Sequence, residues 1–134
     1  ILGEASVIKS FDKIRNHFGM SRIGQAGALA ALTDTDHLPR VRAMVASARA
    51  EVADIARESG LTPLPSATNF VTIDAGKGGA FARRLVAELI ARDIFVRMPF
   101  VAPHDRCIRV SCGRPEDLAA FARALPAALD AAKA

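Results

Sequence analysis

The sequence contains no tryptophan, no tyrosine and only two cysteines, and no apolar run in it reaches the length of a membrane-spanning helix. The first residues also lack the basic region, apolar stretch and small-residue cleavage site of a secretory signal peptide. We therefore expect a cytoplasmic protein that does not bind membranes. The chain opens on Ile1 without an initiator methionine, which predicts a piece of a longer protein.

The net charge of +4 is not organised for nucleic-acid binding. No basic run alternates with aromatic residues, which is the usual sequence pattern of a nucleic-acid interface. Many arginines are instead spread over several predicted helices: Arg15, Arg49, Arg57, Arg83, Arg84, Arg92 and Arg123. We interpret them as solvated helix faces and expect no nucleic-acid partner.

The cysteines predict neither a disulfide nor a metal site. Cys107 and Cys112 lie five residues apart and face opposite sides if the strand that begins at Cys107 stays regular, so they cannot easily bridge. His104 precedes Cys107 by three residues, but zinc requires three or four ligands and the others are missing. We expect two reduced thiols and no metal.

Apolar periodicity divides the chain into a helical first half and a mixed second half. At 134 residues and 51% hydrophobic content, it can bury one core. Helices are predicted over Glu4–Ile14, from the cap Ser21 through the Ala-rich stretch Gln25–Leu32, from Pro39 to a stop at Gly60, over Ala80–Arg92, and from Pro115 onward with a kink or end at Pro126. The small side chains of Gln25–Leu32 further predict that this helix is buried.

Three strands are predicted, over Asn69–Ile73, Ile94–Met98 and Cys107–Ser111. The fold class is therefore α/β in a two-layer α+β arrangement: a small three-stranded sheet covered on one face by helices and preceded by long helices.

Arginines interrupt two of these strands. Because strand side chains alternate between faces, Ile108 and Val110 point to one side and Arg109 to the other, with Cys107 and Ser111. Arg97 repeats this pattern in the neighbouring strand. A planar guanidinium suits bidentate capture of a carboxylate or phosphate. The alternative for either arginine is an ion pair with an acid elsewhere in the fold.

The order and spacing of several segments resemble the C-terminal part of fold type I pyridoxal-phosphate aminotransferases, in the histidinol-phosphate aminotransferase-like branch. The resemblance covers nearly the whole chain and rests on the segments at 1–4, 11–18, 25–32, 65–71, 94–99 and 108–111. It implies that residues 1–34 are the end of the large domain with interdomain helices, and that residues 35–134 are the small C-terminal domain. Asn16-His-Phe18, where Pro-Tyr-Asn is common, and Arg114, where a capping Thr or Ser is usual, depart from the family pattern.

The resemblance also implies three substrate-binding residues. Arg109 matches the arginine that binds the α-carboxylate of the amino-acid or 2-oxo-acid substrate, and Arg97 matches one that helps to hold a distal phosphate. Asn69, in Ser-Ala-Thr-Asn-Phe, matches a residue that borders the active-site cleft, although a turn or strand-start role explains it nearly as well.

Transamination uses pyridoxal 5'-phosphate, which forms a Schiff base with a lysine and needs an acid at its pyridine nitrogen. In the family these groups lie upstream of Ile1, so the resemblance implies that no catalytic residue lies in this chain. Ser10-Phe-Asp-Lys13 mimics the lysine signature, but Lys13 falls in an amphipathic helix without the glycines that follow the family's lysine. We interpret it as a solvated lysine.

The implied function is therefore to supply the substrate-carboxylate site of an aminotransferase, in a homodimer, with the chain inactive alone. Two alternatives stay open: a stand-alone small-molecule-binding or regulatory module without catalysis, and a structural piece that completes a dimer. The amino donor and acceptor do not follow from the sequence.

Overall fold

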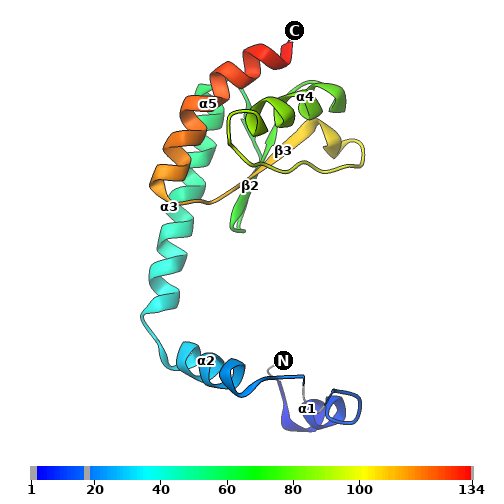
Figure 1. Ribbon diagram of the computed structural model, residues 1–134, viewed down its shortest axis with the longest axis vertical. Coiled ribbons are helices and arrows are strands. Elements are labelled where there is room, and N and C mark those ends of the chain that lie inside the picture. The colour runs from blue at the N-terminus through cyan, green and yellow to red at the C-terminus, as the bar shows by residue number, and fades with distance from the viewer. Residues whose placement is uncertain (1–2, 17–18, 134) are drawn as a thin grey trace. The chain divides into compact units, whose positions relative to one another are not determined.

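A computed structural model describes residues 3–16 and 19–133, so Ile1 and the His17-Phe18 part of the divergent segment lie outside it. The chain divides into two compact units, residues 1–39 and 40–134, and the helix that begins at His37 starts before the boundary. Figure 1 follows the elements along the chain.

The first unit contains two helices, α1 (Ala5–Phe11) and α2 (Arg22–Thr33). The Ser21 hydroxyl caps α2 as predicted, because it accepts a hydrogen bond of 3.0 Å from the Gly24 N–H. The predicted burial of Gln25–Leu32 is wrong within the described residues, since no α2 residue is buried and Leu32 is 67% exposed. The described part of this unit supplies no surface that covers the apolar side of the helix.

The long helix α3 (His37–Glu58) begins after Asp34, whose carboxylate accepts hydrogen bonds from the Asp36 and His37 N–H groups. Its predicted apolar stripe is buried only in the C-terminal part: Ala48, Val52, Ile55 and Ala56. The helix ends at Glu58, two residues before the predicted stop at Gly60, whose φ of +74° suits a residue without a Cβ.

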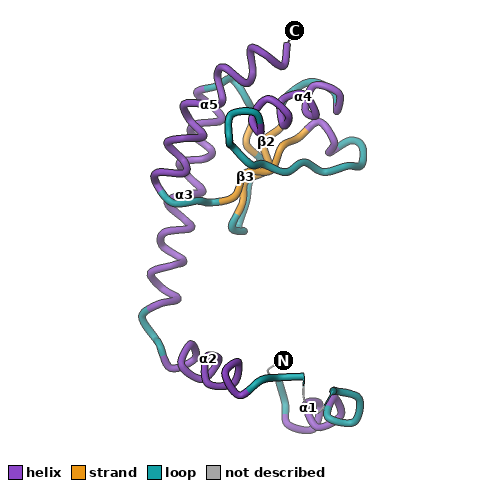
Figure 2. Tube along the Cα trace, in the orientation of Figure 1, coloured by secondary structure: helices purple, strands orange, loops and turns teal. Residues whose placement is uncertain are grey.

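The second unit contains an antiparallel sheet with strand order β1-β2-β3. The strands are β1 (Thr62–Pro63), β2 (Phe70–Asp74) and β3 (Cys107–Ser111), and Figure 2 draws strands in orange. The register pairs Phe70 with Ser111 and Thr72 with Arg109.

The strand predicted over Ile94–Met98 is wrong in extent, because this segment meets β3 only through one isolated bridge between Arg97 and Arg109. Pro99 follows directly and has no N–H with which to continue a ladder. The chain then turns away through a cis peptide bond at Pro103 and a short 3₁₀ helix, η1 (His104–Arg106). The third strand is instead the two-residue β1.

Helices cover one face of the sheet, as predicted. The core joins Val71 and Ile73 of β2 and Ile108 and Val110 of β3 to α3, α4 (Gly79–Ile90) and α5 (Pro115–Lys133). Figure 1 shows α5 beside the C-terminal part of α3, and α5 continues through Pro126 to Lys133. The buried helix side chains are Ala48, Val52, Ile55, Ala56, Phe81, Leu85, Leu89, Leu118, Phe121, Leu125, Ala128, Leu129 and Ala132.

Candidate anion-binding site

Arg109 lies in the middle of β3, on the face of the sheet that points away from the core. Its neighbours Ile108 and Val110 are 0% and 5% exposed and pack against the helices, whereas Arg109 is half-buried and Ser111 exposed. Cys107, predicted on the Arg109 face, is nonetheless buried, and this burial raises the pKa of its thiol. The alternation therefore holds from Ile108 to Ser111.

Arg97 and Arg109 lie directly opposite each other. The Arg97 N–H donates to the Arg109 carbonyl at 3.1 Å, and the Arg109 N–H donates to the Arg97 carbonyl at 2.6 Å. Two residues that exchange both hydrogen bonds across an antiparallel pair have Cα atoms about 5.5 Å apart and project their side chains to the same face. Thr72 flanks Arg109 on the β2 side. The sheet thus carries a row of Thr72, Arg109 and Arg97.

Within residues 3–16 and 19–133, neither Arg97 nor Arg109 has a carboxylate at ion-pair distance. The acids of the second unit that form ion pairs there engage other cations: Asp54 with Arg57, Glu88 with Arg92, Asp74 with Arg106, Glu116 and Asp117 with Arg114, and Asp130 with Lys133. Like charges that lie opposite each other destabilise a sheet. A bound anion would reduce this repulsion, and its oxygen atoms could accept hydrogen bonds from the N–H groups of both guanidinium groups.

The π-face of Phe70 lies against the Arg109 guanidinium, with 4.6 Å between the guanidinium carbon and the ring centroid. Phe70 lies two residues from Thr72 on β2, so it is the diagonal cross-strand neighbour of Arg109. From the same segment the sequence indicated Asn69 and not Phe70. Strand alternation puts Phe70 on the same face of the sheet as Arg109, but its contact with Arg109 could be predicted only with the register between β2 and β3.

Asn69 does not join the two arginines. It precedes β2, and its carbonyl accepts the Cys112 N–H at 2.9 Å. Strand alternation puts Asn69 on the same side as Val71, which faces the core. The exposed Asn69 thus sits at the end of the ladder, on the other side of the sheet from the Arg109 guanidinium.

An open apolar hollow of about 690 Å³ lies beside the arginines. Arg97 and Arg109 contribute to its wall, and the rest comes mainly from apolar residues of α4 and the 95–100 segment: Val86, Ala87, Ile90, Phe95, Val96, Met98, Pro99 and Phe100. This hollow is suited to a molecule that joins an apolar body to an anionic group.

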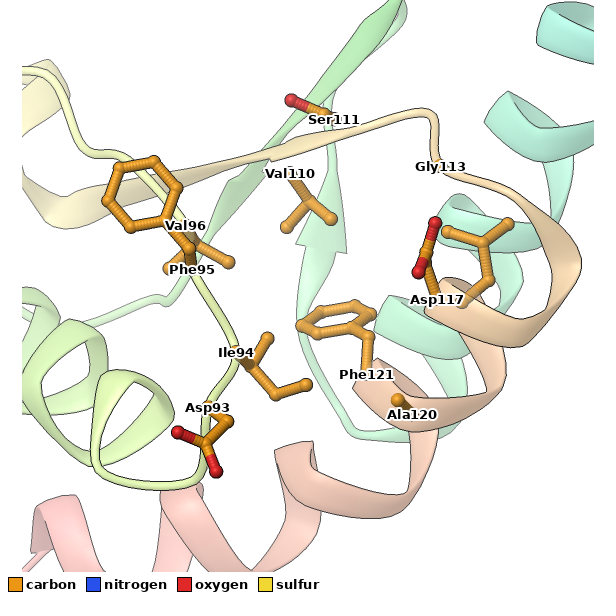
Figure 3. Close-up of a pocket in the computed structure, with 11 residues that line it drawn as sticks. Asp93, Ile94, Phe95, Val96, Val110, Ser111, Gly113, Asp117, Ala120 and Phe121 are labelled. Carbon is orange, nitrogen blue, oxygen red and sulfur yellow. The ribbon is translucent and has the colours of Figure 1, made fainter.

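A second pocket, of about 320 Å³, lies between the 93–96 segment, the end of β3 and α5. Figure 3 shows apolar side chains such as Val96, Val110 and Phe121 in it, together with the carboxylates of Asp93 and Asp117. Neither Arg97 nor Arg109 lines this pocket. Because its charged groups are acidic, it is a poor site for an anion.

The described lysines do not form a site for pyridoxal phosphate. The Lys133 ammonium pairs with Asp130 at 2.7 Å, and the Lys77 ammonium lies over the Phe81 ring. Lys9 and Lys13 are exposed on a unit in which no described helix residue is buried. None of the four lies in an enclosed site beside an acid that could serve a pyridine nitrogen.

The sequence model of the family "Aminotransferase class I and II" matches residues 1–125 of this chain. Among curated relatives, histidinol-phosphate aminotransferase 2 of Ralstonia nicotianae is 32% identical over 123 residues, which are 92% of this chain and 33% of that protein. The histidinol-phosphate aminotransferase of Symbiobacterium thermophilum is 35% identical over 117 residues, or 86% of this chain and 31% of that protein. The chain thus spans about a third of the curated relatives it matches.

A solved structure agrees with these matches. The crystal structure of histidinol-phosphate aminotransferase from Sinorhizobium meliloti, in complex with pyridoxal-5'-phosphate, superposes with a TM-score of 0.88 and 50% sequence identity. The match covers 93% of this chain and 34% of that one. Because the family model matches 125 of its 134 residues, the chain belongs to the class I and II aminotransferases.

Proposed function

We propose that this chain is the C-terminal third of a pyridoxal-phosphate-dependent aminotransferase and supplies its substrate-anion site. The observation that carries the proposal is the pair of opposed arginines, Arg97 and Arg109, with no carboxylate at ion-pair distance among the described residues. In this proposal residues 1–34 end the large domain and residues 35–134 form the small domain.

Arg109 binds the carboxylate of the amino-acid or 2-oxo-acid substrate through its planar fork of N–H donors. Arg97, one position across the sheet, binds a second anionic group such as a phosphate on the distal end of the substrate. The apolar hollow beside both arginines receives the body of the substrate.

The cofactor is attached elsewhere in the longer protein. Pyridoxal phosphate supplies the electron sink for amino transfer when it is bound. Its lysine and acid are provided by the two thirds that this chain does not span, because the described lysines are paired or exposed. The chain alone is therefore inactive, and the complete enzyme is a homodimer.

The test is performed on the enzyme encoded by the complete reading frame. Arg109→Lys keeps the charge but removes the planar fork, so kcat/KM falls about tenfold or more while the absorption band of the bound cofactor is unchanged. Arg123→Lys, on the exposed side of α5, serves as the matched control. Equal kcat/KM in Arg109→Lys and the control would refute the assignment.

A separate test concerns the lysines. The 134-residue chain mixed with pyridoxal phosphate should develop no specific aldimine absorption band. A stoichiometric band that disappears in Lys13→Ala would show instead that the chain carries its own cofactor lysine. Selective binding of an amino acid by the chain alone would favour the stand-alone binding module.

A further inference from the structure

The ring of Phe70 contacts Arg109, the arginine that we propose binds the substrate carboxylate. An arginine on the solvent face of a strand has several rotamers, and holding one of them for a ligand costs conformational entropy. Arg109 has no acid among the described residues to fix its side chain. Its guanidinium carbon instead lies 4.6 Å from the centroid of the Phe70 ring, within the range of a cation–π contact.

The backbone of Phe70 is fixed by two hydroxyl groups of the preceding loop. The Ser66 hydroxyl donates to the Phe70 carbonyl at 2.6 Å, and the Thr68 hydroxyl donates to the same carbonyl at 3.1 Å. The Thr68 carbonyl in turn accepts a hydrogen bond of 2.9 Å from the Arg49 guanidinium of α3. These contacts tie the start of β2 to the loop and to α3, and so fix the point from which the ring projects.

From these contacts we infer that Phe70 is a positioning residue for anion binding by Arg109. The inference rests on the proposed function, because it assigns Phe70 to the same anion site. The contact holds the guanidinium carbon over the ring, and the N–H groups of the guanidinium have no carboxylate partner among the described residues, so they can donate to a carboxylate or phosphate. It reduces the number of orientations that Arg109 loses when the anion binds.

The stacking is tested directly by NMR on the 134-residue chain. In the wild type the ring current of Phe70 shifts the Arg109 Hδ and Hε resonances upfield, and Phe70→Tyr retains this shift because it retains the ring. Phe70→Leu removes the shift. The wild-type spectrum decides the point even if a variant fails to fold, since Arg109 resonances at random-coil positions would overturn the inference.

The consequence for binding is tested by titrating the same proteins with inorganic phosphate at constant ionic strength. The wild type and Phe70→Tyr should bind with similar Kd, and Phe70→Leu about two- to fivefold more weakly. Phe11→Leu is the matched control, because Phe11 is 42% exposed at the end of α1 and is not among the residues that line the hollow.

The outcomes separate the inference from the proposed function. Equal phosphate binding by the wild type and Phe70→Leu would overturn the role of Phe70 and leave the anion site intact. No response of the Arg109 resonances to phosphate in the wild type would overturn both the anion site and the positioning role that depends on it.

Discussion

Replacing Arg97 by glutamine should stabilise the isolated chain, although it removes a charged side chain from a folded sheet. Arg97 lies directly across from Arg109, and neither has an acid partner among the described residues. In the absence of a bound anion the two cations only repel each other. Glutamine has nearly the same length and keeps the backbone bridge, so it removes the repulsion with little change in packing.

The size of the effect follows from the geometry. If the two charges lie about 7 Å apart, Coulomb's law gives a repulsion of about 0.6 kcal/mol in water and about 2.4 kcal/mol at an effective dielectric constant of about 20. Favourable cross-strand pairs in sheets contribute up to about 1 kcal/mol, and we take the same limit for the repulsion of two like charges. We therefore expect Arg97→Gln to raise the free energy of unfolding by about 0.5–1 kcal/mol at low salt.

The assay is urea unfolding of the 134-residue chain in sodium chloride at about 0.01 M and about 1 M, where the Debye length is about 30 Å and about 3 Å. The gain should fall to about one eighth at the higher salt, because screening over about 7 Å removes most of the repulsion. Arg123→Gln, an exposed arginine on α5, is the control and should change stability by less than about 0.5 kcal/mol at either salt. A loss of stability in Arg97→Gln, or a gain that does not depend on salt, would refute the reasoning.

Three further predictions concern the second unit. Leu85→Ala should lower the free energy of unfolding by about 2–5 kcal/mol, because the Leu85 side chain is 0% exposed. Ile90 is 49% exposed on the same helix, so Ile90→Ala should lower it much less, and urea unfolding of both variants measures the difference. Gly76→Ala should cost about 1–2 kcal/mol, because the φ of Gly76 is +69°, and Gly76→Asn should recover part of this loss, which thermal unfolding can measure. The pKa of Asp74 is lowered chiefly by the hydrogen bond from the Gly76 N–H and also by Arg106. The Asp74 carboxylate therefore stabilises the folded state above the unfolded pKa of about 3.9, and this stabilisation is lost as the pH falls through the lower pKa of the folded state. Stability below about pH 5 should therefore depend less on pH in Asp74→Asn than in the wild type.

Patterns of a few neighbouring residues correctly predicted the bounds of β3 and the start of α5. The β3 strand has the predicted bounds Cys107–Ser111, and α5 begins at the predicted Pro115, because alternation and helix-start preferences act over a few residues. The strand predicted over Ile94–Met98 had the right alternation, with Val96 buried and Phe95 exposed. It pairs with β3 only at Arg97, and beyond that bridge Pro99 has no N–H with which to continue the ladder.

Features that depend on distant residues could not be predicted in the same way. The small side chains of α2 indicated burial, but burial needs a surface that the described part of its unit does not supply. Arg97 and Arg109 were predicted to point away from the helices, and their directly opposed positions became clear only from the bridge. Phe70 was missed because its contact with Arg109 depends on the β2-β3 register.

The central claim is that the opposed arginines form an anion site, and phosphate-induced stabilisation of the 134-residue chain tests it most directly. At constant ionic strength, about 10 mM phosphate should raise the free energy of unfolding of the wild type by about 1.4 kcal/mol if Kd is about 1 mM. The double variant Arg97→Gln, Arg109→Gln should lose this gain. An equal gain in both proteins, or none in the wild type, would contradict the account.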